Sequence, residues 1–186
     1  TQSGSTANSY VVVVNASDGT TSTDQTVTVT VADIDDTAPV ITGPTGGAGS
    51  STSTVSINEN STAVHTFSAT DVDTTADATW TLNGGADASQ FSITSAGVLS
   101  FASAPDYETP TQSGSTANSY VVVVNASDGT RSTDQTVTVT VADVDDVAPV
   151  ITGPTGGAGS STSTVEINEN STAVHTFSAT DVDTTA

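Results

Sequence analysis

The 186-residue chain contains no cysteine, no methionine and no lysine, and Arg131 is its only basic residue apart from two histidines. Without cysteine the protein can form neither a disulfide framework nor a thiolate metal site. Its 21 acidic residues give it a formal net charge of −20 at pH 7. Nucleic acids and anionic membranes attract basic surfaces, so this composition excludes both partners and favours cations. No apolar run approaches the length of a membrane-spanning helix, so we expect no direct insertion into a membrane.

The chain also has few residues from which a catalytic site could be built. Its two histidines, His65 and His175, are copies of each other on a predicted strand, and surface or edge positions explain both of them. The sequence shows no set of nucleophile, base and orienting residue, and no glycine-rich loop that would hold a phosphate. We therefore expect that the protein is not an enzyme.

The clearest positive feature is an internal repeat. Residues 1–76 reappear as residues 111–186, which gives a period of 110 residues with four differences. The differing pairs are Thr21 and Arg131, Ile34 and Val144, Thr37 and Val147, and Ser56 and Glu166. A period of this length matches one globular domain and exceeds a solenoid unit. We expect residues 1–36 to be the C-terminal part of one repeat, residues 37–146 a complete repeat, and residues 147–186 the N-terminal part of the next.

Alternating β-branched residues predict an all-β fold. Tyr120, Val122, Val124 and Ala126 fall on one face of a strand, and the valines of residues 135–142 alternate with threonines in the same way. These two segments predict a hairpin whose turn is formed at Asp128 and Gly129. About seven short strands in one repeat, separated by turn residues, predict a β-sandwich. The other expected strands are residues 40–42, 55–58, 64–70, 79–83, 90–93 and 97–101, with a flexible loop or linker at residues 46–54.

The predicted core combines the inward residues of these strands. Its members are apolar residues at alternating strand positions, and they suffice for a core of modest size. They are Val40, Ile57, Val64, Phe67, Ala69, Trp80, Leu82, Phe91, Ile93, Leu99, Phe101, Tyr120, Val122, Val124, Val137, Val139 and Val141.

The carboxylates fall in short clusters instead of being spread evenly along the chain. Clustered carboxylates repel one another unless protons or cations neutralise them. Calcium takes six to eight oxygen ligands, whereas magnesium keeps more of its waters, so the clusters favour calcium. Simpler interpretations stay open: the runs Asp33–Asp36 and Asp143–Asp146 also suit solvated linkers, Glu59 a polar strand end, and Asp128 an ordinary Asp-Gly turn. Asp87 is expected to be a turn or surface residue.

In their order and spacing, these clusters resemble the motifs of a cadherin repeat. The matching strings are NEN (58–60), DVD (71–73), DYE (106–108), ASDG (126–129), DIDDTAP (33–39) and DVDDVAP (143–149). The resemblance implies tandem seven-stranded Greek-key β-sandwich domains, cadherin- or immunoglobulin-like, joined end to end by calcium-binding linkers. The PDYE, ATDVD and DVDD-x-AP strings are similar to those of large bacterial secreted surface adhesins. Two positions depart from the family pattern: the linker asparagine is Asp35 or Asp145, and the next one is Thr37 or Val147.

The resemblance also implies two calcium clusters, with up to about three ions at a complete linker. The first would combine Asp33, Asp35 and Asp36 with Asp71, Asp73 and Asp128. The second would combine Glu59, Asp106, Glu108, Asp143, Asp145 and Asp146 with Asp181 and Asp183.

The expected function is mechanical. Calcium at the linkers would lock the orientation of neighbouring repeats, so that the chain serves as the extender of an extracellular bacterial adhesin or of a similar surface filament. A second hypothesis is a directly adhesive module, in which the repeat binds other copies of itself, a glycan or a host protein. Near-identical repeats suit spacing, because a dedicated binding domain usually departs from its neighbours in loops and aromatic residues.

Overall fold

The computed structural model describes residues 8–73 and 77–183. These residues belong to two compact units, one containing the chain up to Thr37 together with residues 71–73, and the other containing residues 38–70 and 77–183. Strands dominate the described residues, and the one helical element among them is the short 3-10 helix η1 (Ala88–Gln90). The all-β prediction is therefore confirmed. Within the described ranges, no helix is long and apolar enough to cross a membrane.

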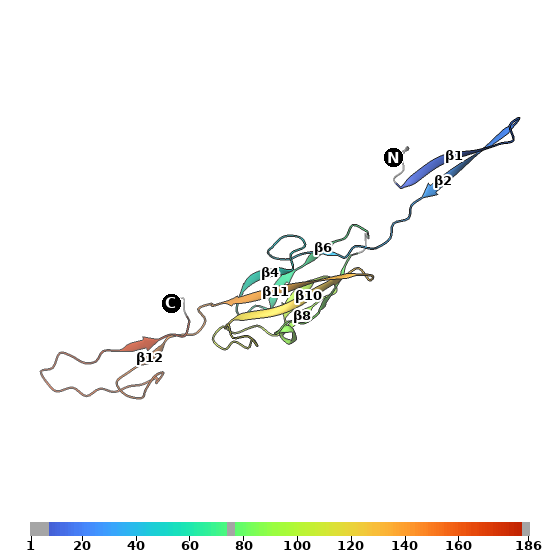
Figure 1. Ribbon diagram of the computed structural model, residues 1–186. Helices are drawn as coiled ribbons and strands as arrows, with labels where there is room; N and C mark the ends of the chain where they lie inside the picture. The colour runs from blue at the N-terminus through green and yellow to red at the C-terminus, as the bar shows by residue number, and fades with distance from the viewer. Residues whose placement is uncertain (1–7, 74–76, 184–186) are drawn as a thin grey trace. The chain divides into compact units, whose positions relative to one another are not determined.

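The first unit consists mainly of a hairpin formed by β1 (Ser9–Ser17) and β2 (Ser22–Thr30). The two strands pair antiparallel from Ser9 opposite Thr30 to Ser17 opposite Ser22, and Figure 1 shows them as a long ribbon. No other strand of the described residues pairs with this hairpin. Its apolar residues are consequently exposed; Val12, for example, is 50% exposed.

The second unit contains a four-stranded sheet in the order β4-β11-β10-β7. Strands β10 and β11 form the hairpin that the alternating valines predicted, in the same register as β1 and β2. Strand β4 pairs parallel with β11 (Figure 1), while β7 pairs antiparallel with β10. The bounds are β4 (Thr52–Asn58), β7 (Thr79–Leu82), β10 (Ser119–Ser127) and β11 (Ser132–Ala142).

Two smaller antiparallel sheets complete the sandwich of this unit. One has the order β5-β9-β8 and the other pairs β3 with β6; later in the chain, β12 and β13 repeat the pairing of β3 and β6. The strand predicted at 64–70 is divided into β5 and β6, which is one reason why the central repeat has more than the seven strands expected. The bounds are β3 (Val40–Thr42), β5 (Ala63–Thr66), β6 (Ser68–Thr70), β8 (Phe91–Ile93), β9 (Val98–Phe101), β12 (Val150–Thr152) and β13 (Ser178–Thr180).

One hydrophobic core joins the sheets of the second unit. Aromatic rings meet in it within one sheet and between sheets: the centroids of the paired residues Phe91 and Phe101 are 4.2 Å apart, and Tyr120 of the four-stranded sheet meets Phe101 edge-on at 5.1 Å. Such pairs stabilise a core beyond the area that they bury. The buried members are Ile41, Phe67, Trp80, Phe91, Leu99, Phe101, Tyr120, Val122, Val124, Ala126, Val137, Val139 and Val141.

Two predictions about the start of the central repeat are wrong in detail. In β3 the fully buried residue is Ile41, not Val40, because a strand of three residues gives too little alternation to fix which face is inward. The stretch 46–54 is not wholly a flexible loop, since β4 already begins at Thr52 through its parallel pairing with β11. Short polar strands of this kind depend on their partner strand more than on their own sequence.

Buried polar residues were not foreseen. Asp87, predicted to be a turn or surface residue, is 1% exposed, and its carboxylate accepts backbone hydrogen bonds from Ser113 and Val121. Gln135 is fully buried on β11 and accepts a hydrogen bond from Ser53 Oγ at 3.0 Å. Gly43 is needed beside it, because a Cβ there would lie 2.2 Å from Gln135 Oε1. These contacts satisfy polar atoms that burial would otherwise leave unpaired.

Candidate metal centre

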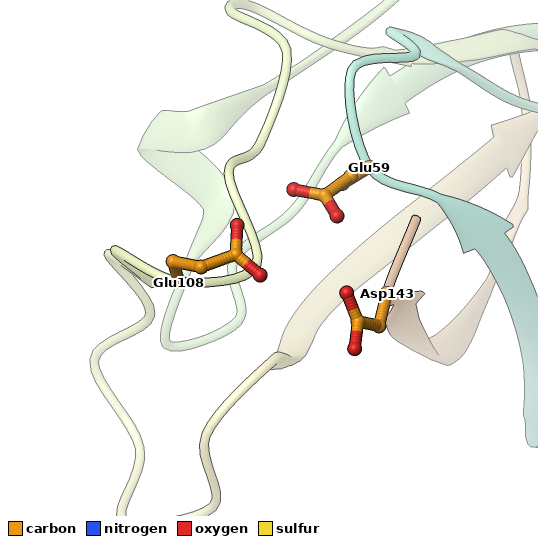
Figure 2. A group of neighbouring side chains, drawn as sticks. All are labelled: Glu59, Glu108 and Asp143. Atoms are coloured by element: carbon orange, nitrogen blue, oxygen red, sulfur yellow. The ribbon is translucent and has the colours of Figure 1, made fainter. Parts of the chain in front are cut away.

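Acidic residues from three segments of the second unit converge beyond the ends of β4 and β11. Glu59 directly follows β4, Glu108 lies on the loop of residues 102–118 between β9 and β10, and Asp143 directly follows β11. Figure 2 shows the three carboxylates turned toward one another. Strand pairing brings the segments together, because Ala142 lies opposite Asn58 in the parallel ladder of β4 and β11.

Glu59 is the buried member of this group, and backbone hydrogen bonds hold its side chain. Its side chain is 3% exposed, and each of its oxygens accepts a backbone hydrogen bond, Oε2 from Tyr107 at 2.7 Å and Oε1 from Val144 at 2.8 Å. The same carboxylate therefore holds both the loop that carries Glu108 and the segment that follows Asp143. These two bonds satisfy both oxygens of a buried side chain.

The carboxylates form two overlapping groups. Oxygens of Glu59, Glu108 and Asp143 lie within 4.8 Å of one another, and so do oxygens of Glu108, Asp146 and Asp183. Glu108 belongs to both groups and so connects them. The geometry brings together five of the eight residues predicted for the second linker, and they come from the segments around residues 59, 108, 143–146 and 183.

Asp183 is joined to residues 146 and 147 through their backbone. Its Oδ2 accepts hydrogen bonds from the backbone N–H of Asp146 at 2.9 Å and of Val147 at 2.8 Å. The first unit has the same arrangement one period earlier, where Asp73 Oδ2 accepts from Asp36 and Thr37 at 3.1 and 2.6 Å. The second aspartate of each DVD motif thus fixes the backbone of the preceding linker.

Several carboxylate oxygens are buried without any hydrogen-bond partner. Among the described residues, Glu108 Oε1 and Asp183 Oδ1 have this property at the second linker, and Asp35 Oδ1 and Asp71 Oδ2 have it in the first unit. A buried carboxylate oxygen without a donor is costly unless a cation lies beside it. The chain has one arginine and no lysine to serve this purpose. An all-oxygen set with several carboxylates suits a hard divalent cation, and its size and charge fit calcium.

The pKa values of two carboxylates in this cluster are raised. Burial, and then the nearby carboxylates of Glu59, Asp183 and Asp143, raise the pKa of Glu108. Burial and the charges of the same cluster likewise raise the pKa of Asp145. Both shifts are opposite to the lowering that hydrogen-bond donors to a carboxylate cause.

The other predicted ligands are placed differently. Asp106 lies outside both groups: it is exposed, and hydrogen bonds from Thr109 lower its pKa. Asp181 Oδ1 accepts a hydrogen bond from the backbone of Asp183, as Asp71 Oδ1 does from Asp73. Asp33 is exposed in the first unit. Asp128 Oδ1 accepts the two backbone bonds of the Asp-Gly turn, while its Oδ2 is buried without a partner, so the turn interpretation accounts for one oxygen only.

Sequence reasoning missed two asparagines of this region. Asn60 Nδ2 donates to Asp146 Oδ2 at 2.6 Å, and Asn118 Nδ2 donates to the carbonyl oxygen of Tyr107 at 3.0 Å. Both have a left-handed backbone, with φ of 60° and 58°. Asparagine tolerates this conformation better than other residues with a side chain. Asn60 lies inside the NEN motif and was available as a signal, whereas no acidic motif contains Asn118.

Comparison with known proteins assigns the fold. The architecture is a cadherin-like β-sandwich, and residues 53–142 match the Cadherin domain family. Among curated proteins, the chain is 36% identical over 167 residues to the Cadherin EGF LAG seven-pass G-type receptor 2 of Homo sapiens. This match covers 85% of the chain but 5% of the receptor. The chain thus spans a small part of the curated relatives that it resembles.

Solved structures of tandem cadherin domains have the same fold. The crystal structure of human CDH23 EC21-23 superimposes with a TM-score of 0.63 at 21% identity, over 95% of this chain and 55% of that chain. The structure of PcdhgB3 EC1-4 gives a TM-score of 0.59 at 25% identity, over 78% of this chain and 35% of that chain. The β-sandwich prediction and the resemblance to cadherin repeats are confirmed at this level.

Proposed function

We propose that this chain is part of an extracellular array of cadherin-type repeats that calcium makes rigid at the linkers. Cadherin domains are extracellular adhesion modules that bind calcium and are not enzymes, and residues 53–142 match that family. The observation that carries the proposal is the overlap of the two carboxylate groups at Glu108, with buried oxygens on Glu108 and Asp183 that lack a donor. The proposed repeat boundaries are residues 1–36, 37–146 and 147–186.

The proposed ligands are the acidic residues of the two linkers. We keep the full sets predicted from the motifs, with up to about three calcium ions at a complete linker. The first set is Asp33, Asp35, Asp36, Asp71, Asp73 and Asp128, and the second is Glu59, Asp106, Glu108, Asp143, Asp145, Asp146, Asp181 and Asp183.

The mechanism follows from charge. Without a cation, the carboxylates of the second linker repel one another and favour separation of the segments that carry them. Bound calcium would supply the positive charge that neutralises this repulsion. Glu59, Glu108 and Asp143 would then hold the end of one repeat, while Asp183 would hold the start of the next and the linker backbone. A cation that binds the assembled arrangement stabilises it by mass action.

The proposed biological setting is the extender region of a bacterial surface adhesin or filament. It rests on the PDYE, ATDVD and DVDD-x-AP strings and on the near identity of residues 1–76 and 111–186. Near-identical repeats provide length and spacing without a specialised binding surface.

A directly adhesive role is the second candidate. One solved relative is described as a cis-dimer, the protocadherin gammaB7 EC3-6 structure. The repeat would in that case bind other copies of itself, or a glycan or host protein. Beads coated with the 186-residue chain test binding between copies: clumping that requires calcium supports adhesion and counts against a passive spacer, whereas dispersed beads exclude adhesion between copies.

Thermal unfolding in excess calcium, in EGTA and in EGTA with magnesium tests the proposal. We expect an upward shift of Tm that is large with calcium and small with magnesium, because magnesium retains its waters. Replacing Asp183 by asparagine should reduce the calcium shift. Equal Tm values in the three conditions would mean that the carboxylate groups bind no calcium, and the chain would then have the cadherin-like fold without the calcium-dependent linker.

A further inference from the structure

The loop that carries Glu108 is held in place by side chains and by single backbone hydrogen bonds, and not by strand pairing. Residues 102–118 contain no strand, although they join β9 to β10 and supply a carboxylate to both groups. A ligand on such a loop is effective only if other contacts fix it. We propose that Asn118 is the residue that positions Glu108 for calcium; this inference rests on the proposed function.

Asn118 and Glu59 hold the peptide groups next to Glu108 from two sides. Asn118 Nδ2 donates to the carbonyl oxygen of Tyr107 at 3.0 Å, and the N–H of Tyr107 donates to Glu59 Oε2 at 2.7 Å. Tyr107 directly precedes Glu108, and its carbonyl belongs to the peptide bond that leads into that residue. Asn118 is 7% exposed, so water does not readily replace its amide.

The backbone of Asn118 contacts the second ligand-bearing segment. Its carbonyl oxygen accepts a hydrogen bond from Val141 at 2.9 Å, two residues before Asp143. Asn118 therefore links the loop of Glu108 to the end of β11, from which Asp143 projects. Asn118 makes these two contacts, to Tyr107 through its side chain and to Val141 through its carbonyl, with a left-handed φ of 58°. Fixing ligands before the cation binds lowers the entropy cost of binding, and loss of such supporting contacts weakens metal sites.

The chain contains a matched control for this residue. Asn8 is the copy of Asn118 one period earlier; its φ is also 58°, and its carbonyl oxygen accepts a hydrogen bond from Val31 at 2.9 Å. The 186-residue chain has no copy of Tyr107 or Glu108 before Asn8. A substitution at residue 8 therefore reproduces the backbone change without affecting a DYE loop.

The test compares Asn118→Gly with Asn8→Gly, because glycine keeps the left-handed backbone and removes the amide. Calcium affinity is measured by isothermal titration, and stability by thermal unfolding in EGTA. We expect Asn118→Gly to weaken calcium binding about tenfold, as for supporting residues of metal sites, and Asn8→Gly to leave it unchanged. A lower Tm in EGTA with wild-type calcium affinity would overturn the inference and make Asn118 a purely structural residue. Absence of calcium binding by the unmodified chain would refute the proposed function itself.

Asn118→Asp gives a second test, in which the added charge and the lost hydrogen bond change the calcium affinity in opposite directions. Aspartate has the same shape and also tolerates a left-handed backbone, but its carboxylate cannot donate to the Tyr107 carbonyl. Added negative charge alone would strengthen calcium binding, whereas loss of the positioning bond weakens it. We expect weaker binding than in the unmodified chain, with Asn8→Asp as the control. Binding as tight as or tighter than that of the unmodified chain would overturn the positioning role.

An independent observation concerns the turn of each hairpin. Asp18 and Asp128 both use Oδ1 to accept backbone hydrogen bonds from the residues two and three positions ahead, at 2.6 to 2.8 Å. Their second oxygens differ. Asp18 Oδ2 accepts a hydrogen bond from Thr21 Oγ1 at 3.2 Å, while Asp128 Oδ2 is buried without a partner. Position 131, the copy of Thr21, is Arg131, which has no hydroxyl group.

We infer that the residue at this position determines how well the turn aspartate can bind calcium. A threonine hydroxyl occupies the second carboxylate oxygen, and calcium would have to displace it. Arg131 gives that oxygen no hydrogen bond, although, besides backbone hydrogen bonds, its positive charge contributes to the lowered pKa of Asp128. Repeats that differ at this one position would then have linkers of different calcium affinity, in an array whose repeats are otherwise almost the same.

Arg131→Thr and Arg131→Val test this inference as a pair. Both remove the arginine charge and both are β-branched, so they differ in the hydroxyl group alone. We expect the threonine variant to bind calcium about fivefold more weakly than the valine variant, as for one hydrogen bond of ordinary strength. Equal affinities of the two variants would overturn the inference. If the unmodified chain binds no calcium, the proposed function fails instead.

Discussion

Glu59→Gln tests whether the buried carboxylate holds the linker region together. The Glu59 side chain is 3% exposed, and its two oxygens accept backbone hydrogen bonds from Tyr107 and Val144. Glutamine has the same shape, but one of its two terminal atoms is an amide nitrogen, which donates. In either orientation one backbone N–H therefore loses its acceptor and faces another donor.

The magnitude follows from that single lost interaction. A hydrogen bond to a charged group contributes about 1.5–3 kcal/mol, and a buried donor left unpaired costs about 1–3 kcal/mol. Both figures describe the same loss, so we expect the free energy of unfolding to fall by about 2–3 kcal/mol. For a domain of about 100 residues, this corresponds to a Tm lower by about 8–15 °C. The loss should be at least as large in excess calcium as in EGTA, because removing one negative charge relieves repulsion only when no cation is bound.

Glu169→Gln is the matched control, and circular dichroism during heating is the measurement. Glu169 is the copy of Glu59 in the following repeat and is exposed. An exposed substitution of this kind changes stability by less than about 0.5 kcal/mol. If Glu59→Gln and Glu169→Gln unfold at the same temperature in both conditions, the two backbone hydrogen bonds do not stabilise the protein, and the reasoning is refuted.

Three further substitutions address the core, a close contact and the pKa of one ligand. Ile41→Ala should lower the free energy of unfolding in urea by about 2–5 kcal/mol, because Ile41 is fully buried, whereas Ile151→Ala, at a copy that is 57% exposed, should have little effect. Gly43→Ala should cost about 1–3 kcal/mol in the same assay, since its Cβ would lie 2.2 Å from Gln135 Oε1. Because the pKa of Glu108 is raised in the folded protein, its protonated form is the one that favours folding. The free energy of unfolding of the calcium-free protein should therefore fall as the pH rises through that pKa. Glu108→Gln should remove that loss in thermal unfolding in EGTA from about pH 4 to about pH 7.

Each of these changes has its own control. Gly114→Ala serves for Gly43→Ala, because a Cβ at residue 114 would meet nothing within 4 Å. Equal stability of the two variants would contradict the close contact. Glu166→Gln serves for Glu108→Gln, since Glu166 is exposed. If both glutamine variants have the same pH dependence, burial and neighbouring carboxylates do not set the pKa of Glu108. Equal stabilities of Ile41→Ala and Ile151→Ala would contradict the inward placement of Ile41.

Local patterns predicted the long strands well and the short ones less well. Tyr120, Val122 and Val124 alternate over nine residues, and their inward face is the one that is buried. In β3, three residues give no usable period, and the buried residue is Ile41 instead of Val40. The parallel pairing of β4 with β11 joins residues about 80 positions apart, and alternation within one segment carries no information about such a partner.

The acidic motifs predicted candidate ligands but not the contacts that support them. The convergence of Glu59, Glu108 and Asp143 follows the order of the motifs along the chain. The roles of Asp87 and Asn118 depend on loop backbone that the sequence does not fix. Buried polar residues of this kind have the composition of ordinary turns until their donors and acceptors are known.

The two hairpins have a consequence for how such an array assembles. Residues 9–30 and 119–140 differ only at Thr21 and Arg131 and pair in the same register, so they offer the same inward side chains. The sheets formed by the segment from Val40 to Phe101 therefore cannot distinguish their own hairpin from that of a neighbouring repeat by contact energy. The short connection of residues 102–118 favours pairing with the hairpin of the same repeat, because it keeps that hairpin at a higher local concentration than any other. In the proposed array, rapid closure of this loop after unfolding would protect against exchange of hairpins between repeats, a characteristic failure of repeat proteins.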